Sequence, residues 1–397
     1  MHTQNLNRHS LESRDPTVEM PKALTICHFS SVHSTLKSRS FHMECMPLAQ
    51  QGFHVRFVAP AGVNGIHGGV EFFATRRVEN LLLRILLNPA FLYKVLCLDA
   101  DIYHFQDPEL IPLALIAKLV LRKRMVYDAF EDFPSMVRNS NRVPGVLQPV
   151  VMALISTFEH LAARIFDGVM TADPFTLRRL ARTGKSRKLV FFNFPNLNLF
   201  PQPDGSRRPY DFVYRGGLSE RTGTMLLLEA LRIMADRGKQ ARLLLMGYSD
   251  SELAEKNLRD KIRALGLESM VEMRGRIKHE EMAAALGQAR IGVSPLQANP
   301  KFLLNLPVKI FEYWACGLPV IASDLPPIRP FFRDRQFGLL VKPGDARALA
   351  DALNWMLDHP AEAARMGEEG RRAVVQRYNN GKEIRKLSLF LRRIAAQ

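Results

Sequence analysis

Short apolar runs alternate with amphipathic helical patterns along the whole chain, and this alternation constrains the fold more than any other feature. In the first half, runs typical of strands lie at 23–28, 53–59, 101–105, 124–128, 167–171 and 188–192. A second series lies at 211–215, 241–246, 270–273, 290–294, 319–322 and 338–341. Between them, the segment 193–209 (NFPNLNLFPQPDGSRRP) contains four prolines and predicts a linker. Strands that alternate with helices form parallel sheets with helices on both faces.

The two series predict an α/β protein with two Rossmann-like, doubly wound domains that face each other across a cleft. We expect a loose N-terminal tail at 1–21, a first domain at 22–200 and a second domain at 201–378. Residues 379–397 have a helical pattern, and we expect this helix to pack back toward the first domain. Ligands of doubly wound sheets bind beyond the carboxyl ends of the strands. The loops that follow the strands are therefore the first candidates for a functional site.

The chain carries a formal net charge of +16, from 55 Lys and Arg against 39 Asp and Glu. With 47% hydrophobic and 24% charged residues, the composition excludes a disordered or fibrous chain. The surplus is +7 over residues 1–200 and +9 over the remainder, so it is not confined to a tail. It favours an anionic partner, such as a phosphorylated substrate or anionic lipid. No basic stripe with interleaved aromatic residues is seen, so we expect no nucleic-acid partner.

One apolar stretch bears on membranes. Residues 81–98 (LLLRILLNPAFLYKVLCL) are interrupted by Arg84 and Lys94 and do not predict a spanning helix. They fit either a core helix or a helix that lies on a membrane surface. With the basic residues of 76–96 and 122–124, the second interpretation makes an anionic membrane surface a candidate partner. Four scattered cysteines without a CxxC pair indicate a reducing compartment, so we expect a cytoplasmic protein, with attachment to the inner face of the plasma membrane as a further option.

The segment 305–324 (NLPVKIFEYWACGLPVIASD) has the most informative chemical pattern. Pro307 suits the first turn of a helix, and Gly317 suits its end. Backbone N–H groups at the helix start, with Lys309 beside them, are suited to bind a phosphate group. Glu312 can accept hydrogen bonds from two neighbouring hydroxyl groups, such as those of a ribose. The alternative is a surface pair between Lys309 and Glu312 at i, i+3, worth about 0.3 kcal/mol.

This segment resembles the donor-site motif of family 4 (group 1) glycosyltransferases of the GT-B fold. Members carry a helix that ends in a pattern like EYMAxGxPVVAS, and residues 312–323 read EYWACGLPVIAS. Residues 212–223 (FVYRGGLSERTG) resemble the opening of the family's second domain, and 275–281 (GRIKHEE) resemble a turn beside the nucleobase. Residues 31–59 and 101–110 resemble a subgroup that builds bacterial surface polysaccharides. The resemblance runs from about residue 22 to the C-terminus.

The resemblance implies a hexosyltransferase-type enzyme of polysaccharide or glycolipid biosynthesis. The second domain would bind a nucleoside-diphosphate sugar, often a UDP-sugar, and the first would bind a saccharide or lipid-linked acceptor. Transfer would occur with retention by an ion-pair-like attack on one face, with no protein nucleophile, metal or cofactor. The implied donor-binding residues are Gly216, Gly217, Arg221, Ile277, Pro307, Lys309 and Glu312. The candidate catalytic residues are His104, Glu131, Arg221 and Lys309. The acceptor-side candidates are His33, Arg39, Asp107, Glu109 and Asp132.

Four positions depart from the family pattern. Leu304 stands eight residues before Glu312, where members often carry a first glutamate. Gln106 replaces the second histidine of an HxHDPEL pattern, and Phe130 replaces the histidine of a YDxHED pattern. A phenyl ring can neither donate nor accept a strong hydrogen bond. The Arg and Lys of a GR…KG pattern correspond to Gly217 and, by spacing, to Arg221 or Thr222.

Alternatives remain at this stage. The departures fit either an active enzyme or a catalytically impaired partner protein that binds a nucleotide-sugar. Another GT-B activity, such as an epimerase or a phosphorylase, is a further class, although a pyridoxal-phosphate lysine context is not seen. Asp107 has a second interpretation as the cap of a helix at 108–119. His33 and Arg39 fit loop capping and surface charge as well as contact with a ligand.

Overall fold

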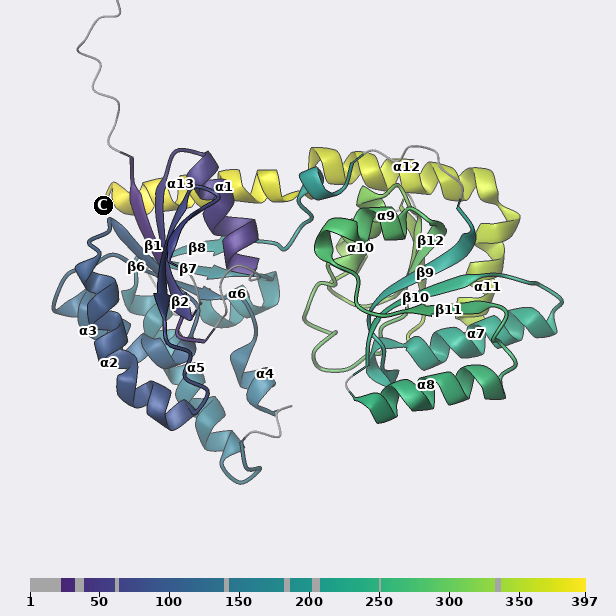
Figure 1. Cartoon of the computed structure of the whole chain (residues 1–397), viewed down its shortest axis with the longest axis horizontal. Coiled ribbons are helices and arrows are strands. Elements are labelled where there is room, and N and C mark those ends of the chain that lie inside the picture. Colours follow the sequence, from purple (N-terminus) through teal and green to yellow (C-terminus); the bar gives the residue numbers. More distant parts are fainter. Residues whose placement is uncertain are drawn as a thin grey trace, which may run out of the picture.

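The chain forms two α/β domains placed side by side, as the computed structural model shows (Figure 1). The structure describes residues 23–32, 39–60, 64–138, 143–181, 186–201, 208–249, 251–332 and 337–397. The expected tail at 1–21 and the candidate residue His33 lie outside these ranges. The prediction of two doubly wound α/β domains is confirmed.

The first domain is built on an eight-stranded sheet of order β3-β4-β2-β1-β5-β6-β7-β8. Every pair in it is parallel except the hairpin of β3 and β4. The strands are β1 (Thr25–Phe29), β2 (His54–Pro60), β3 (Gly65–His67), β4 (Val70–Thr75), β5 (Ile102–Phe105), β6 (Met125–Ala129), β7 (Gly168–Thr171) and β8 (Arg187–Val190). Most of their residues are buried, because helices cover both faces of the sheet.

Two groups of helices cover this sheet. One face packs against a π-helical turn (Phe41–Cys45), α1 (Met46–Gln50) and the C-terminal helix. The other face packs against the remaining helices. These are α2 (Leu81–Cys97), α3 (Ile111–Leu119) after a 3₁₀ turn (Pro108–Leu110), α4 (Phe133–Arg138), α5 (Gln148–Ile165) and α6 (Pro174–Ala181). Within the described ranges, no helix is long and apolar enough to cross a bilayer.

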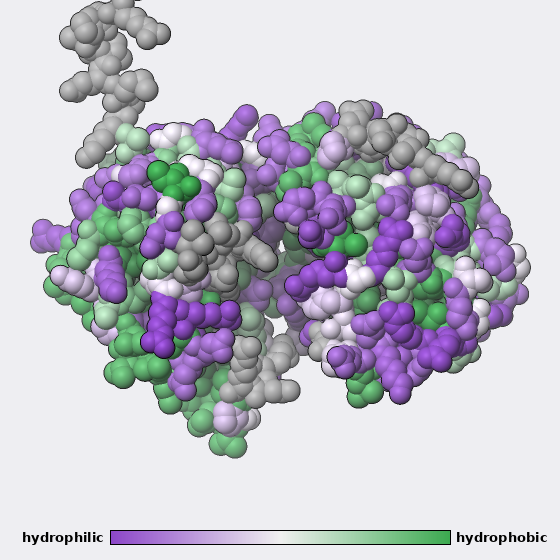
Figure 2. All heavy atoms as spheres, viewed as in Figure 1, coloured by the Kyte–Doolittle hydropathy of each residue, from purple (hydrophilic) through white to green (hydrophobic). Residues whose placement is uncertain are grey.

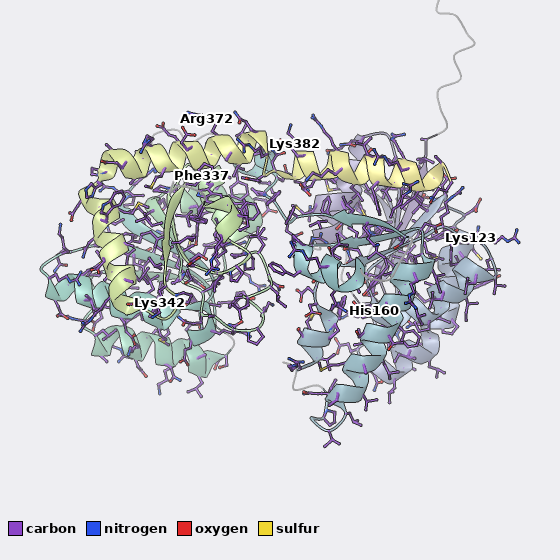
Figure 3. The ribbon with its side chains drawn as sticks, turned by 180° about the vertical axis from the view of Figure 1, so that it is seen from behind. Lys123, His160, Phe337, Lys342, Arg372 and Lys382 are labelled. Atoms are coloured by element: carbon purple, nitrogen blue, oxygen red, sulfur yellow. The ribbon has the colours of Figure 1, made fainter. Side chains whose placement is uncertain are left out.

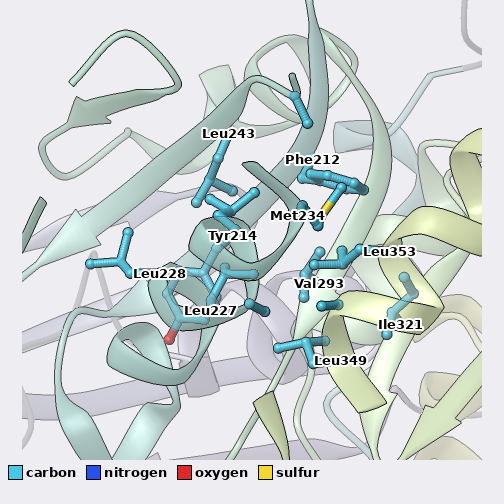
Figure 4. Packing of buried hydrophobic residues seen from close by; sticks show 14 of the residues in the cluster. Phe212, Tyr214, Leu227, Leu228, Met234, Leu243, Val293, Ile321, Leu349 and Leu353 are labelled. Atoms are coloured by element: carbon cyan, nitrogen blue, oxygen red, sulfur yellow. The ribbon is translucent and has the colours of Figure 1, made fainter. Parts of the chain in front are cut away.

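The second domain is built on a six-stranded parallel sheet of order β11-β10-β9-β12-β13-β14. Its strands are β9 (Tyr210–Gly217), β10 (Leu243–Tyr248), β11 (Val271–Arg274), β12 (Ala289–Ser294), β13 (Val320–Ser323) and β14 (Gly338–Val341). Its helices are α7 (Thr224–Asp236), α8 (Glu252–Ala264), α9 (Met282–Leu286), α10 (Lys309–Ala315), α11 (Ala346–Asp358) and α12 (Pro360–Gln376), with 3₁₀ turns at Glu220–Thr222, His279–Glu281 and Arg329–Phe331. Figure 4 shows one face of this core, where Phe212 and Leu243 of the sheet pack near Met234 of α7 and Leu353 of α11.

The chain crosses between the domains twice. The first crossing is the linker after β8, with a 3₁₀ turn at Leu197–Leu199, and the second lies between α12 and α13 (Asn380–Ala395). The two crossings are joined, since the backbone N–H of Asn380 donates to the carbonyl of Pro195 at 3.0 Å. Seen from behind, α12 carries Arg372 over the second domain, whereas α13 carries Lys382 at its start and runs over the first (Figure 3). Its apolar face contributes Ile384, Leu387 and Leu391 to the core of the first domain.

Sequence patterns missed three local features. The hairpin of β3 and β4 was not expected, because its strands are short and one of them is largely exposed. The sequence pattern does not predict the π-helical turn before α1, a rare form that is often found at functional sites. The helix expected to start at Pro307 instead begins at Lys309, within the usual uncertainty of helix ends.

Candidate active site

A tight backbone turn ends β9. Gly216 has φ of +146°, and its neighbour in the register with β10, Gly247, has φ of +154°. A Cβ on Gly247 would lie 1.7 Å from the carbonyl oxygen of Gly216, which no side chain tolerates. A Cβ on Gly216 would lie 3.0 Å from the Nζ atom of Lys309. The glycines therefore let the lysine amine approach the backbone at the carboxyl end of the sheet.

Lys309 is a nearly buried cation at the start of α10. Its side chain is 8% exposed, and its Nζ atom lies 4.3 Å from the centre of the Tyr214 ring. The Tyr214 hydroxyl donates a hydrogen bond to the carbonyl of Gly217 at 2.8 Å, which ties the ring to the glycine turn. Among the described residues, no carboxylate pairs with this lysine. In the described part of the chain, its charge is therefore not balanced by a carboxylate at the point where β9, β10 and α10 meet.

Glu312 lies one turn further along α10 and is 3% exposed. Its Oε2 atom lies 3.2 Å from Nη1 of Arg215, the residue that precedes the glycine pair. The backbone N–H of Arg215 donates in turn to the Tyr313 hydroxyl at 2.9 Å, so α10 holds the end of β9 in place. The alternative of a surface pair between Lys309 and Glu312 is wrong, because both are buried and Glu312 pairs with Arg215.

The remaining donor-side candidates surround this turn. Arg221 lies in the 3₁₀ turn after β9 and is exposed, and its carbonyl accepts from the Gln297 N–H at 3.2 Å. The Thr222 hydroxyl folds the turn back by donating to the carbonyl of Gly217 at 2.7 Å. Pro307 and Ile277 are half-buried. The structure thus brings four of these residues together at the carboxyl end of the second sheet, namely Gly216, Gly217, Lys309 and Glu312.

A cleft lies between the two domains. It is lined on one side by Phe130, Glu131 and Asp173, which follow strands of the first sheet. The linker contributes Asn193, and the segment before and within α10 contributes Asn305. Figure 2 shows an open notch between the two lobes at this level. Glu131 is therefore the candidate catalytic carboxylate that faces the space between the domains.

Arg39 is the centre of a buried polar network beside this cleft. Its Nη1 atom lies 2.9 Å from Oε1 of Glu44 and 3.1 Å from Oδ2 of Asp128, and its Nε atom donates to the side-chain oxygen of Asn193. Burial raises the pKa of Glu44 to about 8, and it also raises the pKa of Asp128. Burial alone would lower the pKa of Arg39, but the charges of Glu44 and Asp128 outweigh it and raise that pKa. Two buried carboxylates share one guanidinium, so one of them is held protonated near neutral pH.

The prediction that His104 contacts a ligand at the cleft rim is wrong in this structure. His104 lies on β5 beneath the π-helical turn and is only 1% exposed. Its Nδ1 atom is 3.2 Å from Nδ1 of His28, its register partner on β1, and 3.9 Å from Oε2 of Glu44. Burial, with the charge of Arg39, lowers the pKa of His104 to about 3, so the imidazole is neutral. In the described part of the chain, these three residues are the one group with metal-ligating spacing, and Arg39 already supplies a positive charge there.

Asp107 and Glu109 hold a loop in place. Asp107 precedes the 3₁₀ turn but does not cap it, so that interpretation is wrong. Its carboxylate instead accepts from the Ser31 N–H at 2.6 Å, and both carboxylates accept from the Ser31 hydroxyl at 3.2 Å. Arg84 of α2 turns inward and pairs with Glu109. It is therefore not available to contact a membrane surface, although the sequence made it a candidate for that role. The acceptor-side assignment of these two carboxylates is corrected to a structural one.

Asp132 is engaged as well. Its Oδ1 atom lies 3.4 Å from Nη2 of Arg179, and its other oxygen accepts from the Ser135 hydroxyl. Arg179 also lies 2.7 Å from Oε2 of Glu159, whose Oε1 accepts from the Tyr127 hydroxyl at 3.0 Å. The structure therefore separates Glu131, which lines the cleft, from Asp132, which belongs to a structural network.

Comparison with known proteins places the chain in a family. A family model described as "Glycosyl transferases group 1" matches residues 199–373. A phosphatidyl-myo-inositol mannosyltransferase of Mycobacterium tuberculosis is 31% identical over 288 residues, which cover 71% of this chain and 70% of that protein. The chain belongs to the group 1 glycosyltransferases.

A further relative and two solved structures resemble parts of the chain or its fold. An amylovoran biosynthesis glycosyltransferase of Erwinia amylovora is 29% identical over 193 residues, so the chain spans about half (47%) of its length. A sucrose-phosphate synthase from Thermosynechococcus elongatus has a TM-score of 0.72 at 20% identity, over 94% of this chain and 99% of that one. A protein from Anabaena, solved in complex with UDP, has a TM-score of 0.68 at 17% identity, over 93% and 99%. The predicted GT-B fold is confirmed.

Several residues at or near the candidate site are not predicted from the sequence. Arg215 was missed, although its place directly before the glycine pair was a usable signal. Gly247 was recognised only as a strand end, because its contact with Gly216 depends on the register between two strands. Asp128 belongs to the segment that resembles the YDxHED pattern, whereas Glu44 and Asn193 have no sequence signal of their own, since these residues meet only where separate elements and the linker come together.

Proposed function

We propose that this glycosyltransferase moves a sugar from a nucleoside-diphosphate sugar to a saccharide or lipid-linked acceptor. The proposed enzyme is similar to family 4 and transfers a hexosyl group in polysaccharide or glycolipid biosynthesis. The configuration at the anomeric carbon is retained. Its support comes from the donor-side geometry of the second domain and from relatives whose names describe such activities. The Anabaena protein is solved with UDP and, separately, with UDP-glucose, which favours a UDP-linked donor.

The observation that carries the proposal is the state of Lys309. A buried ammonium group without a carboxylate partner is unfavourable unless a ligand supplies the negative charge. The amine lies beside the glycine turn of β9, and the exposed Arg221 follows in the 3₁₀ turn after this strand. A diphosphate at this turn would meet a cation that has no carboxylate partner among the described residues. The same turn is flanked by Glu312, which is suited to accept hydrogen bonds from the ribose hydroxyls.

The proposed mechanism divides the work between the domains. Charge develops on the diphosphate as the bond to the sugar breaks, and Lys309 and Arg221 stabilise that charge. Glu312 and Arg215 orient the nucleoside. Glu131 lines the first-domain side of the cleft and would accept the proton that the acceptor hydroxyl loses as it attacks the sugar. The attack proceeds on the face that the leaving group vacates, so a covalent intermediate on the protein is not needed.

The proposed acceptor sets the location of the enzyme. A lipid-linked saccharide lies at a membrane surface, so the enzyme would work in the cytoplasm, attached peripherally to the inner face of the plasma membrane. The positive net charge of +16 suits both the donor diphosphate and anionic headgroups.

The test combines binding with turnover. Purified protein is screened with UDP-, GDP- and dTDP-sugars for thermal stabilisation, because a ligand that binds only the folded state raises the unfolding temperature. Glu312→Ala should reduce stabilisation by the best donor, whereas Glu369→Ala, on the exposed surface of α12, should not. Release of nucleoside diphosphate in the presence of membrane extracts then reports transfer. Unchanged donor binding in Glu312→Ala would refute the assignment of the donor site, and binding without any release would favour an impaired partner protein.

A further inference from the structure

One surface of the first domain is far more apolar than the rest of the molecule. Of the 22 large apolar side chains that the described residues expose, fifteen lie on α2, the end of α3 and the start of α5. Leu82 and Leu86 are 78% and 74% exposed, Val120 is 70% exposed and Val146 is 89% exposed. Exposed apolar patches of this kind mark interaction sites. We call these three segments, 81–93, 116–121 and 146–154, the three-helix surface.

The segments form one continuous surface. The helix α2 packs against α3, and α3 packs against α5. In Figure 2, hydrophobic residues gather over α2 and at the lower tip of the first lobe, where α5 begins. The second domain exposes only scattered apolar residues, such as Leu253 on α8. The apolar character is therefore a property of this surface and not of the whole protein.

Packing against the core does not explain why α2 exposes so many apolar side chains. Of the 17 residues of α2, only Asn88, Leu92 and Val95 are buried, so the helix uses a narrow stripe to attach to the domain. The run from Leu81 to Leu87 faces outward except at Arg84, which turns in to pair with Glu109. A helix that needed only to cover the core would carry polar residues at these outward positions.

The charge pattern identifies the partner. Neither α2, nor α3, nor the stretch 143–158 contains a single acidic residue. Exposed basic side chains lie at its edge, including Lys94 and Arg122. Apolar side chains bordered by basic residues are typical of proteins that rest on anionic bilayers, where the apolar groups enter the boundary between headgroups and acyl chains.

We propose that the three-helix surface docks the protein on an anionic lipid bilayer. The inference deepens the proposed function, on which it rests for its biological purpose, since docking would bring a lipid-linked acceptor to the first domain. The sequence indicates only the stretch 76–96 and the triplet 122–124 as candidates. The structure adds the ends of α3 and α5, which lie far apart in sequence, and removes Arg84.

The experiment is co-sedimentation of the full chain with vesicles of phosphatidylcholine and phosphatidylglycerol, and with vesicles of phosphatidylcholine alone. We expect binding to the mixed vesicles that salt weakens but does not abolish. The variant L82E/L86E should bind at least about tenfold more weakly, because two charges would enter the apolar boundary. The matched control Leu253→Glu, also an exposed leucine on a helix, should bind like the wild type.

Three parallel measurements make the result decisive. Thermal unfolding confirms that both variants fold, and the thermal response to UDP reports the donor site separately from lipid binding. Light scattering after size exclusion reports the oligomeric state. Failure of the wild type to bind vesicles, or equal loss in Leu253→Glu, overturns the proposal. A wild-type dimer that L82E/L86E converts to a monomer, without any vesicle binding, overturns it in favour of self-association.

Discussion

Replacing Lys309 by methionine should raise stability and weaken ligand binding in the same protein. Methionine keeps the unbranched shape of the side chain and removes only the charge. The lost contact with the Tyr214 ring, at 4.3 Å, is worth about 1–2 kcal/mol. Burying an ammonium that is 8% exposed and lacks a carboxylate partner in the described chain costs on the order of 3 kcal/mol. We therefore expect the free energy of unfolding to rise by about 1 kcal/mol, and the unfolding temperature by about 2–4 °C.

Binding of nucleoside diphosphate should change in the opposite direction. A hydrogen bond to a charged group contributes about 1.5–3 kcal/mol, so the Kd for UDP should rise by about 10- to 100-fold. Thermal unfolding without ligand and titration calorimetry with UDP measure the two effects separately. Lys239→Met serves as the control, because this exposed lysine pairs with Asp358 on the far side of the second domain. A variant of Lys309 that is less stable and binds UDP with unchanged affinity would refute the reasoning.

Two further changes test the buried network and the glycine turn. The pKa of Glu44 is raised to about 8 from 4.5 in the folded protein, so its contribution to stability is fully present below about pH 4.5 and is lost as the pH rises through 8. Glu44→Gln, which keeps the size of the side chain but does not titrate, should therefore show a smaller fall in urea midpoint between about pH 5 and pH 8 (about the two ends of this loss) than the wild type. Gly247→Ala should destabilise the second domain by more than about 1 kcal/mol, because φ of +154° and the carbonyl of Gly216 exclude a Cβ. It should also abolish stabilisation by UDP, and a wild-type response to UDP would contradict the role of the turn.

The fold was largely predictable because its signals are local. Most parallel strands of the two sheets are short apolar runs, and burial on both faces makes such runs stand out from the helical patterns between them. The hairpin of β3 and β4 was missed because Gly65–His67 is short and exposed and resembles a loop. The crossing of α13 to the first domain was expected from its helical pattern and its place after the second series. The packing of this helix, which places Ile384 and Leu391 in the core of the first domain, depends on surfaces that exist only in the folded domain.

The site was predictable where one segment carries both the chemistry and its position. Lys309 and Glu312 share α10, and the glycine pair ends β9, so the spacing within α10 and the family resemblance together place them at the carboxyl end of the second sheet. His104, Asp107 and Glu109 also end strands or start helices at such an edge, yet the structure buries or occupies them. Their partners, His28, Ser31 and Arg84, come from other elements. A sequence pattern shows where a strand ends. It does not show which side chains of other elements contact a residue there and bury it or occupy its polar groups.

The network around Arg39 links the chemistry of the cleft to the relative position of the domains. Asn193 belongs to the linker and lines the cleft, and it accepts a hydrogen bond from Arg39. Arg39 is fixed from behind by Glu44 and Asp128, so it cannot follow the linker without leaving two buried carboxylates to face each other. If the second domain rotates, the linker must therefore either lose the contact between Asn193 and Arg39 or bend only at residues that follow Asn193. The second course is favoured, because the carbonyl of Pro195 also accepts from Asn380 and fixes both crossings at that point. Closure of the cleft should then bend the chain between Pro195 and β9, which leaves the wall formed by Phe130, Glu131 and Asn193 rigid while the donor side moves toward it.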